Sequence, residues 1–469
     1  MTPKNATPKT ENNHLTKDSV ITMDGTKSNS DQDAQNAALI APQDRRLAFI
    51  AVILATAVCV VDASIVNIAL PTIAKSLNTT PAESVWVVSS YQIVSAMFLL
   101  PLAALGDAIG RRRIYLFGLA LFVAASLACA IAPNLLILTL ARAVQGLGGA
   151  AVMSLNMALM RTIYPPKQLG QAIGGIMLSV SISAAVAPTL ASLILSVSSW
   201  PFLFLINLPV GGLALWLGYG RLREPKQDRR EFDKLSAISS AVAIGFLVMA
   251  LEQSGQSDNL WQIIALSGIG IAAMAILITR QTKLSLPFLP IRMLTTRGVM
   301  PVMNASFFAF IGQSAVMVAA PFLLEHELGR NPIETGLLLT PWPVFLGLAS
   351  MAAGRLAGRY SMRSLVTLGY GLMAVAMLAI LLLPNNAQNL DIIWRMTLCG
   401  IGFGLSQTPA NRTIMSLVPH ESSGIVGGLN AAARLLGQAI GAASVALMFA
   451  HFADHTGWVT GPRMGLLLG

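Results

Sequence analysis

Long apolar runs separated by short polar segments fill the chain from residue 47 onward. Many of them exceed 18 residues and do not alternate polar with apolar positions, a pattern typical of membrane-spanning helices. Because lipid offers the backbone no hydrogen bonds, a spanning segment must be a helix or part of a closed barrel. The pattern predicts thirteen spanning helices, at residues 47–70, 84–105, 114–133, 135–160, 168–196, 200–219, 235–252, 260–279, 299–324, 335–357, 364–384, 391–415 and 424–450.

The two ends of the chain differ from these runs. Residues 1–46 are rich in Asn, Thr, Ser, Asp and Lys, so we expect a disordered tail. The tail has no short apolar core before a small-residue cleavage site, which argues against a cleaved signal peptide. The final stretch "RMGLLLG" (463–469) looks like the opening of a fourteenth span that is missing or truncated, and a short apolar tail is the alternative. An even number of spans favours the missing helix, because it keeps both termini on one side.

Composition and charge agree with a membrane protein. The chain is 54% apolar and 11% charged, whereas a soluble domain is about a quarter charged. The net charge of +10 could indicate a nucleic-acid partner. If the tail lies in the cytoplasm, however, Lys and Arg collect in the cytoplasmic loops, and the outer loops carry only Lys75, Arg330 and Arg463. This bias predicts a multi-pass membrane protein with a cytoplasmic N-terminus, lipid contacts and no nucleic-acid partner.

The chain contains little that could bind a metal or nucleotide. Its three cysteines, Cys59, Cys129 and Cys399, lie in apolar runs without metal-ligand spacing, and its five histidines lie in the tail or near span ends. We therefore expect no disulfide framework and no metal site. The chain has no GxxxxGK[ST] loop, so ATP is not the expected source of energy.

The two halves of the chain echo each other. "PAES" (81–84) matches "PIET" (332–335), "GDAIGR" (106–111) matches "GRLAGR" (354–359), and Arg142 matches Arg395, all at nearly one offset. Matching elements have the same inside/outside sense, so the repeat is parallel. We expect two six-helix bundles, at 47–220 and 299–469. The segment 221–298 between them is a cytoplasmic linker with two inserted spans, at about 235–252 and 260–279.

One acid lies deep within the first span. Asp62 is eight residues before Leu70, or about 12 Å from the outer end of the helix. An acid in the membrane is costly and usually functional, and removal from water favours its protonated form. Asp62 is therefore a candidate proton site and a counter-ion for a cationic substrate. The alternative is a buried acid that Asn67 or a neighbouring helix holds for packing alone.

The natural partner of Asp62 is Arg142 in the fourth span. It lies seven residues beyond Leu135, or about 10 Å deep, which is close to the depth of Asp62. An arginine stays charged in proteins. It could therefore hold the ionised acid and release it when the helices shift, although a purely structural ion pair is the alternative. Gln145 lies three residues further on the same helix face and could share the network.

Several stretches resemble one family. "GDAIGRRR" (106–113) and "RAVQGLGGA" (142–150) resemble the loop 2–3 and span-four signatures of the major facilitator superfamily. "VDASIVNIALP" (61–71) and "NAAARLLGQAIGAA" (430–443) resemble signatures of its fourteen-span drug:proton antiporters, the QacA/EmrB type. In "SISAAVAPTLAS" (181–192) Pro188 remains, but Ala or Ser stands where these antiporters have glycines. The resemblance implies an all-α integral membrane fold, with substrate bound between two halves that rock against each other.

The resemblance also implies roles for single residues. It ties Arg142 to proton coupling, and it makes Pro188, Arg395 and Arg434 possible structural or gating residues. It makes the loop after the second span a latch on the cytoplasmic side in one of two states. Positive-inside charge alone would explain the arginines of this loop but not its other residues. The loop residues concerned are Gly106, Asp107, Gly110, Arg111, Arg112 and Arg113.

The sequence thus predicts a proton-coupled multidrug efflux transporter that exports lipophilic, cationic compounds by alternating access. We expect no cofactor, because the proton gradient supplies the energy, and we expect small lipophilic substrates and protons as partners. One alternative is an exporter of a metabolite, siderophore or anionic compound, in which Arg142, Arg395 and Arg434 dominate recognition. A non-transporting membrane sensor is another. An enzyme is not expected, since no histidine cluster or nucleophile with a base occurs in the spans.

Overall fold

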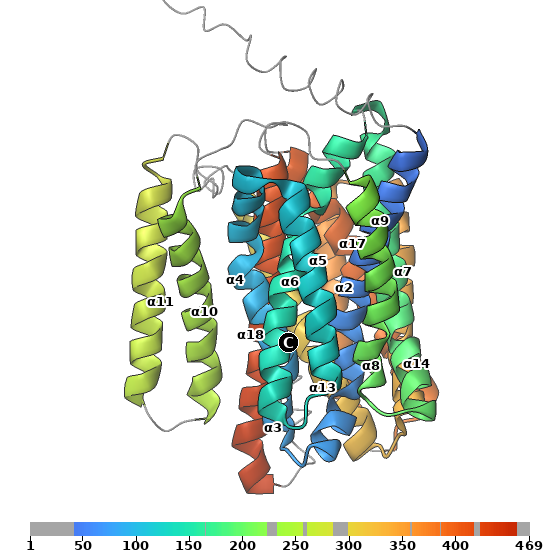
Figure 1. The fold of residues 1–469 in the computed structure, drawn as a ribbon. Helices are drawn as coiled ribbons and strands as arrows, with labels where there is room; N and C mark the ends of the chain where they lie inside the picture. The colour runs from blue at the N-terminus through green and yellow to red at the C-terminus, as the bar shows by residue number, and fades with distance from the viewer. Residues whose placement is uncertain are drawn as a thin grey trace, which may run out of the picture.

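The computed structural model describes residues 42–164, 166–222, 232–256, 260–284, 299–356, 359–384, 386–416 and 423–456. The expected tail before residue 42, the linker segments 223–231 and 285–298, and the stretch "RMGLLLG" fall outside these residues. Each of the thirteen predicted spans lies on helix (Figure 1). Ten helical segments of the described chain are long and apolar enough to cross a membrane. The chain is therefore an all-helical, multi-pass membrane protein.

Nine of the predicted spans are each one helix. Their bounds are α2 (Pro42–Ser76), α5 (Arg111–Ala130), α6 (Leu135–Ile163), α7 (Pro166–Val197), α10 (Lys234–Gln256), α11 (Leu260–Gln281), α16 (Met362–Leu381), α17 (Asn389–Ser416) and α18 (Ser423–Thr456).

The other four spans are each divided into two segments. The pairs are α3 (Pro81–Ser84) with α4 (Trp86–Ile109), α8 (Phe202–Leu205) with α9 (Asn207–Arg221), α13 (Val299–Phe322) with the π-helix η1 (Leu323–Glu327), and α14 (Pro332–Leu339) with α15 (Pro341–Leu356). The first pair begins with a capping box, in which Thr80 and Glu83 bond each other's backbone amides and Pro81 occupies the first turn.

The same helix pairings occur twice in the molecule. In the first set, α6 packs against α4 and α5, and α2 packs against α7. In the second set, α17 packs against α15 and α16, and α13 packs against α18. These are corresponding helices of the sequence repeat, so the two bundles share one internal arrangement. They meet where α2 faces α13, α4 faces α18, and α7 faces α14 and α15.

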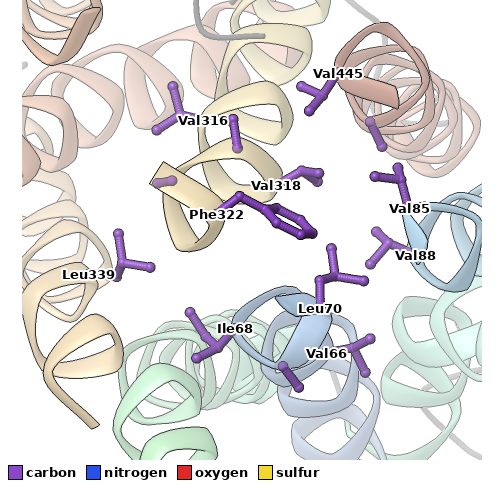
Figure 2. Close-up of a cluster of buried hydrophobic side chains, with 14 of the residues drawn as sticks. Val66, Ile68, Leu70, Val85, Val88, Val316, Val318, Phe322, Leu339 and Val445 are labelled. Carbon is purple, nitrogen blue, oxygen red and sulfur yellow. The ribbon is translucent and has the colours of Figure 1, made fainter. Parts of the chain in front are cut away.

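An apolar cluster joins the two bundles at one end. Leu70 of α2 points toward Phe322 and Val318 of α13, and the cluster also includes Val66 and Ile68 of α2 and Val316 of α13 (Figure 2). Its rim is completed by Val85 just before α4, Val88 of α4, Leu339 of α14 and Val445 of α18. Most of these side chains are fully buried. This end of the molecule, called the apolar plug below, is therefore closed by side chains from both halves.

Helices α10 and α11 form a hairpin beside the two bundles (Figure 1). Helix α10 packs against α4 of the first half and α18 of the second. Gly245 lies against Met97 of α4, and Val248 packs with Ile93 and Ala439. The hairpin therefore covers the seam between α4 and α18.

A polar clamp ties together the two helices of the hairpin. Arg280 Nε donates to both oxygens of Asp233, at 2.8 and 3.0 Å, and the Ser236 hydroxyl donates to Asp233 Oδ2 at 2.5 Å. Gln281 Nε2 donates to the Ser236 hydroxyl at 2.7 Å. The Arg280 bond lowers the pKa of Asp233 to about 2, and Ser236 contributes to the shift. The Asp233 carboxylate is therefore ionised at all ordinary pH values.

Candidate functional site

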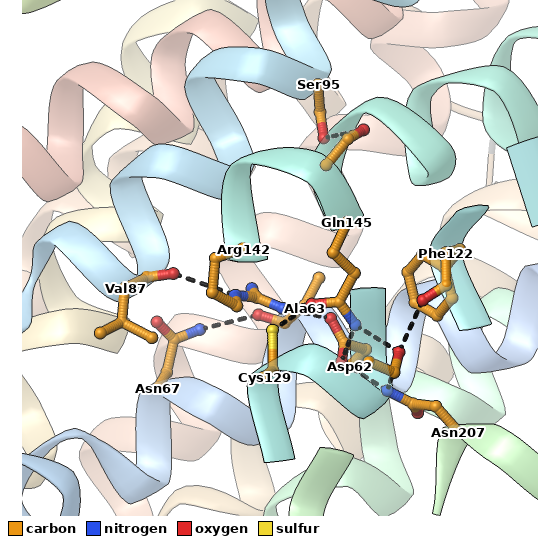
Figure 3. Close-up of polar contacts among 12 residues, drawn as sticks. Asp62, Ala63, Asn67, Val87, Ser95, Phe122, Cys129, Arg142, Gln145 and Asn207 are labelled. Carbon is orange, nitrogen blue, oxygen red and sulfur yellow. Dashed lines mark hydrogen bonds and ion pairs between the residues drawn. The ribbon is translucent and has the colours of Figure 1, made fainter. Parts of the chain in front are cut away.

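The site is centred on Asp62, in the middle of α2. Asp62 is fully buried, and its carboxylate receives hydrogen bonds from two other helices (Figure 3). Arg142 Nη1 of α6 donates to Asp62 Oδ2 at 2.5 Å. The similar depths expected from the sequence thus correspond to a direct ion pair, with both partners out of solvent. A buried charge needs such a partner to persist.

Two amides bind the other oxygen of Asp62. Gln145 Nε2 of α6 donates to Oδ1 at 2.8 Å, and Asn207 Nδ2 at the start of α9 donates to the same atom at 2.6 Å. Both amides also donate to the hydroxyl of Ser126 on α5, which in turn donates to the Phe122 carbonyl. Asp62 Oδ1 therefore accepts two bonds, whereas Oδ2 accepts one.

Arg142 is held by more than its carboxylate. Its Nε donates to the Val87 carbonyl of α4 at 3.0 Å, and its Nη1 also donates to Gln145 Oε1 at 2.6 Å. The guanidinium lies over the Tyr91 ring, 4.3 Å from its centroid, and 5.7 Å from that of Phe204. Cations are attracted to the faces of aromatic rings in this way. Arg142 therefore links α2, α4 and α6 at one point.

Sequence reasoning found part of this set. The structure brings together Asp62, Arg142 and Gln145 as expected, but it places Asn67 elsewhere. Asn67 Nδ2 donates to the Ala63 carbonyl of its own helix at 3.2 Å. Five residues along a helix rotate a side chain by about 140°, so Asn67 and Asp62 point in different directions. Asn207 and Ser126 take part instead. The sequence does contain a signal for Asn207, because it is a lone polar amide within the apolar run 200–219.

The predicted latch loop joins α4 to α5. Arg111 Nε donates to Asp107 Oδ1 at 2.7 Å. Arg112 Nη2 donates to the Tyr219 carbonyl of α9 at 2.7 Å. Gly110 connects the helices with φ 122°, and a Cβ on Gly106 would lie 2.7 Å from Leu155 of α6. These contacts of the loop lie within the first bundle, so a latch to the second bundle remains a prediction.

Pro188 lies where α7 meets the second bundle. Ser192 donates to the Pro188 carbonyl at 2.9 Å, and a Cβ on Gly336 of α14 would lie 2.6 Å from that same carbonyl. One residue on, the hydroxyls of Thr189 and Thr340 are 2.9 Å apart. The close approach that glycines of α7 would give is thus supplied by a glycine on the facing helix.

The two remaining arginines have different surroundings. Arg395 Nε donates to the Ala379 carbonyl at 2.8 Å, and its Nη1 donates to the Asp391 carbonyl and carboxylate at 2.7 and 3.4 Å. It is therefore held within the second bundle. Arg434 of α18 is partly exposed and makes no hydrogen bond or ion pair with the residues that the structure describes.

Comparison with known proteins identifies the family to which the chain belongs. The family model of the Major Facilitator Superfamily matches residues 52–442. The chain belongs to this superfamily. It is 43% identical to the uncharacterized transporter YebQ of Escherichia coli over 87% of this chain and 90% of YebQ. It is also 31% identical to the multidrug resistance protein Stp of Mycobacterium tuberculosis, over 84% and 74% of the two chains.

Other relatives are named for different substrates. The riboflavin transporter RibZ of Clostridioides difficile is 28% identical over 84% of this chain and 88% of its own. Among solved structures, one of the peptide transporter POT superposes with a TM-score of 0.66 at 16% identity, covering 93% of this chain and 96% of POT. The chain therefore has the major facilitator fold, and its family and relatives indicate a membrane transporter.

Proposed function

We propose that this protein is a proton-coupled exporter of small lipophilic compounds that works by alternating access, of the fourteen-span drug:proton antiporter type. The observation that carries the proposal is the set of bonds to Asp62, a fully buried acid with a fixed cation and two amide donors. Relatives named as multidrug resistance proteins and efflux pumps support the export of drugs. The bacterial inner membrane is the proposed location, with the N-terminus in the cytoplasm.

The two oxygens of Asp62 have different roles in the proposed proton step. Oδ1 accepts two amide hydrogen bonds, which occupy both of its lone pairs. An arriving proton therefore binds at Oδ2 and displaces Arg142, which retains Gln145 and the Val87 carbonyl as acceptors. Neutral Asp62 no longer attracts the guanidinium, so the electrostatic link between α2 and α6 weakens.

Release of this link reaches the interface between the halves through α4. Arg142 bonds the Val87 carbonyl and lies on the Tyr91 ring, and both residues belong to α4. This helix packs against α18 of the other half, and its residue Val88 and its N-cap Val85 help to form the apolar plug. Protonation at Asp62 would thus favour the state in which the plug is open, and deprotonation would favour the described state.

Lipophilic cations that compete with the proton for Asp62 remain one form of this proposal. In the described state Asp62 has no exposed surface, and all its bonds are satisfied within the first half. A bound cation would therefore have to replace Arg142 at Oδ2. This requirement makes Asp62 a proton carrier first and a substrate ligand second.

Everted membrane vesicles energised with a proton gradient test the proposal. Lipophilic cations and anions are added in turn while an internal pH dye is followed, with wild type, Asp62→Asn and the control Asp391→Asn. Asp391 is a half-exposed carboxylate at the start of α17, outside the network. We expect compounds to dissipate the gradient with wild type and Asp391→Asn but not with Asp62→Asn. Dissipation by Asp62→Asn at the wild-type rate would refute Asp62 as the proton carrier.

A further inference from the structure

Of the three arginines Arg142, Arg395 and Arg434, only Arg434 makes no hydrogen bond or ion pair with the residues that the structure describes. Arg142 has Asp62, and Arg395 has Asp391. Arg434 has no acceptor among the described residues, although it lies about ten residues into an apolar helix. A guanidinium does not lose its charge in a protein, and an uncompensated cation at this depth is costly. An arginine at this position therefore needs a compensating interaction or a function.

The contacts of α18 show where Arg434 points. One side of the helix, with Gly437 and Gly441, lies against the backbone of α13 at Phe307 and Ile311. Another side, with Leu435 and Ala439, packs against apolar residues of α4. Successive residues turn by about 100°, so Arg434 and Gln438 project between these two sides. The sector between α13 and α4 is the centre of the molecule, where the two halves face each other.

The position of Val445 relates Arg434 to the apolar plug. Val445 lies on the same side of α18 and forms part of the apolar plug, and it is about 16 Å further along the helix at the usual rise. Arg434 therefore faces the interface between the two halves, below the closed end.

Polar neighbours on the same helix face surround Arg434. Asn430 is one turn before it and donates to Asn411 of α17 at 2.8 Å, and Gln438 is one turn after it. We call Asn430, Arg434 and Gln438 the central polar stripe. The cluster of Leu99, Leu100, Met153 and Leu435 borders it on the side of α4 and α6. A charged donor beside apolar walls is the arrangement of a site that orients a mostly apolar ligand by one polar group.

We propose that Arg434 is a substrate-binding residue that recognises an anionic group, such as a carboxylate, on the lipophilic compounds that this protein carries. The inference rests on the proposed function and specifies its substrate class. The anion supplies the negative charge that the described residues do not place beside Arg434. The planar guanidinium can donate two parallel hydrogen bonds to a carboxylate. Gln438 and Asn430 add amide groups on either side.

Binding to purified protein in detergent tests this without a proton gradient. The probes are fluorescein and rhodamine 6G, which share a xanthene ring system but are anionic and cationic at pH 7.5. Fluorescence polarisation gives their affinities for wild type, Arg434→Gln, Arg434→Lys and the control Arg395→Gln. Arg395 is matched in residue type and lies on a membrane helix of the same half, but it is already paired.

We expect wild type to bind fluorescein more tightly than rhodamine 6G. Arg434→Gln should weaken fluorescein about tenfold or more, the usual effect of losing a charged hydrogen bond, without weakening rhodamine 6G. Arg434→Lys should retain part of the preference, and Arg395→Gln all of it. The proposal fails if wild type does not prefer the anion, or if Arg434→Gln, confirmed as folded by size exclusion, leaves the preference intact or weakens both probes equally. Proton coupling through Asp62 would be unaffected by that failure, because the vesicle experiment tests it separately.

Discussion

The two oxygens of Asp62 are bound by groups of different kinds, and this difference determines how the residue can act. Neutral amides of α6 and α9 hold Oδ1, while a cation of α6 holds Oδ2. Removing one partner of a buried pair leaves an uncompensated charge, which usually costs about 3–5 kcal/mol. The ion pair is therefore stable only as a unit, and a proton is the smallest species that can separate it.

The Asn207 amide gives a direct test of this arrangement. In Asn207→Ala, Asp62 Oδ1 keeps only the Gln145 donor, and the ionised carboxylate loses a bond of about 1.5–3 kcal/mol. Asp62 should then hold its proton more tightly. We expect the pH of half-maximal proton exchange in vesicles to rise by about one unit or more.

Asn67→Ala is the matched control for this experiment. Asn67 is on the same helix as Asp62, but its side chain bonds only the Ala63 carbonyl. Its pH profile should coincide with that of wild type. Equal shifts in the two variants would show that the profile reports general damage to α2 rather than the bond to Asp62.

At this scale the sequence predicts the charged residues and misses most neutral ones. Asp62 and Arg142 are conspicuous because charge is rare in apolar runs, and helix rise places them at one depth. Ser126 and Tyr91 are ordinary residues of membrane helices, so nothing local distinguishes them. Asn67 was grouped with Asp62 by closeness in sequence, although rotation about the helix axis separates them. Which neutral side chain reaches the acid depends on helix packing, which one sequence does not specify.

Among the helices, the connection between α4 and α5 depends on one glycine. Gly110 has φ 122° and ψ 122°, a conformation open almost only to glycine. We expect Gly110→Ala to lower the free energy of unfolding by about 1–3 kcal/mol. Thermal unfolding of the purified protein measures this. Gly212→Ala is the control, because a Cβ there meets nothing within 4 Å and alanine favours a helix; a larger loss in that variant would contradict the argument.

The clamp between α10 and α11 should make the stability of the hairpin depend on pH. The bond from Arg280 holds the pKa of Asp233 at about 2, below its ordinary value of 3.8. A lowered pKa stabilises the fold above the ordinary value, and this contribution disappears as pH falls through about 2. Asp233→Asn should therefore unfold at a lower temperature than wild type at pH 5–7, and the difference should vanish near pH 2.

Ser239→Ala is the control for the clamp. Its hydroxyl bonds only the Ser236 carbonyl of its own helix, so its difference from wild type should be small and constant with pH. A difference between Asp233→Asn and wild type that persists unchanged at pH 2 would show that Asp233 acts through packing and not through its charge.

The sequence predicts the positions of the helices well but not their interruptions. Apolar runs continue through Ile206 and Thr340, so hydropathy gives no sign that α8 and α14 end there. The π-helix at Leu323–Glu327 begins inside the apolar run of α13, which ends at Leu324, so its start is also not visible in the pattern. Such features depend on how two helices fit side by side, as at Gly336 and Pro188, and not on burial in the membrane.

For the whole molecule, the sequence repeat predicts two bundles of one design, and the repeated pairings confirm it. It does not predict that the plug is closed, because the repeat concerns the contacts within each bundle and not those between the bundles. The limits of the bundles at residues 220 and 299 stay a prediction.

Phe322 offers a test of the plug. Its ring is fully buried and lies 5.1 Å from that of Phe449. Phe322→Ala should destabilise the closed end by about 3 kcal/mol, which favours the open state on the order of a hundredfold. A membrane-impermeant thiol reagent should then label Val88→Cys much faster. Phe308→Ala is the control on the same helix, because Phe308 is 66% exposed; equal labelling in the two backgrounds would argue against the plug as a gate.

The hairpin makes the two sides of the transporter unequal toward the lipid. Helix α10 lies over the seam between α4 and α18, so hydrocarbon chains cannot reach that seam there. Across the molecule, α7 and α14 meet with exposed apolar side chains nearby, including Leu193, Val197 and Leu337. For a compound dissolved in the bilayer, α10 therefore covers one seam, whereas no inserted helix among the described residues covers the other. Any sideways entry from the membrane is directed to the side of α7 and α14.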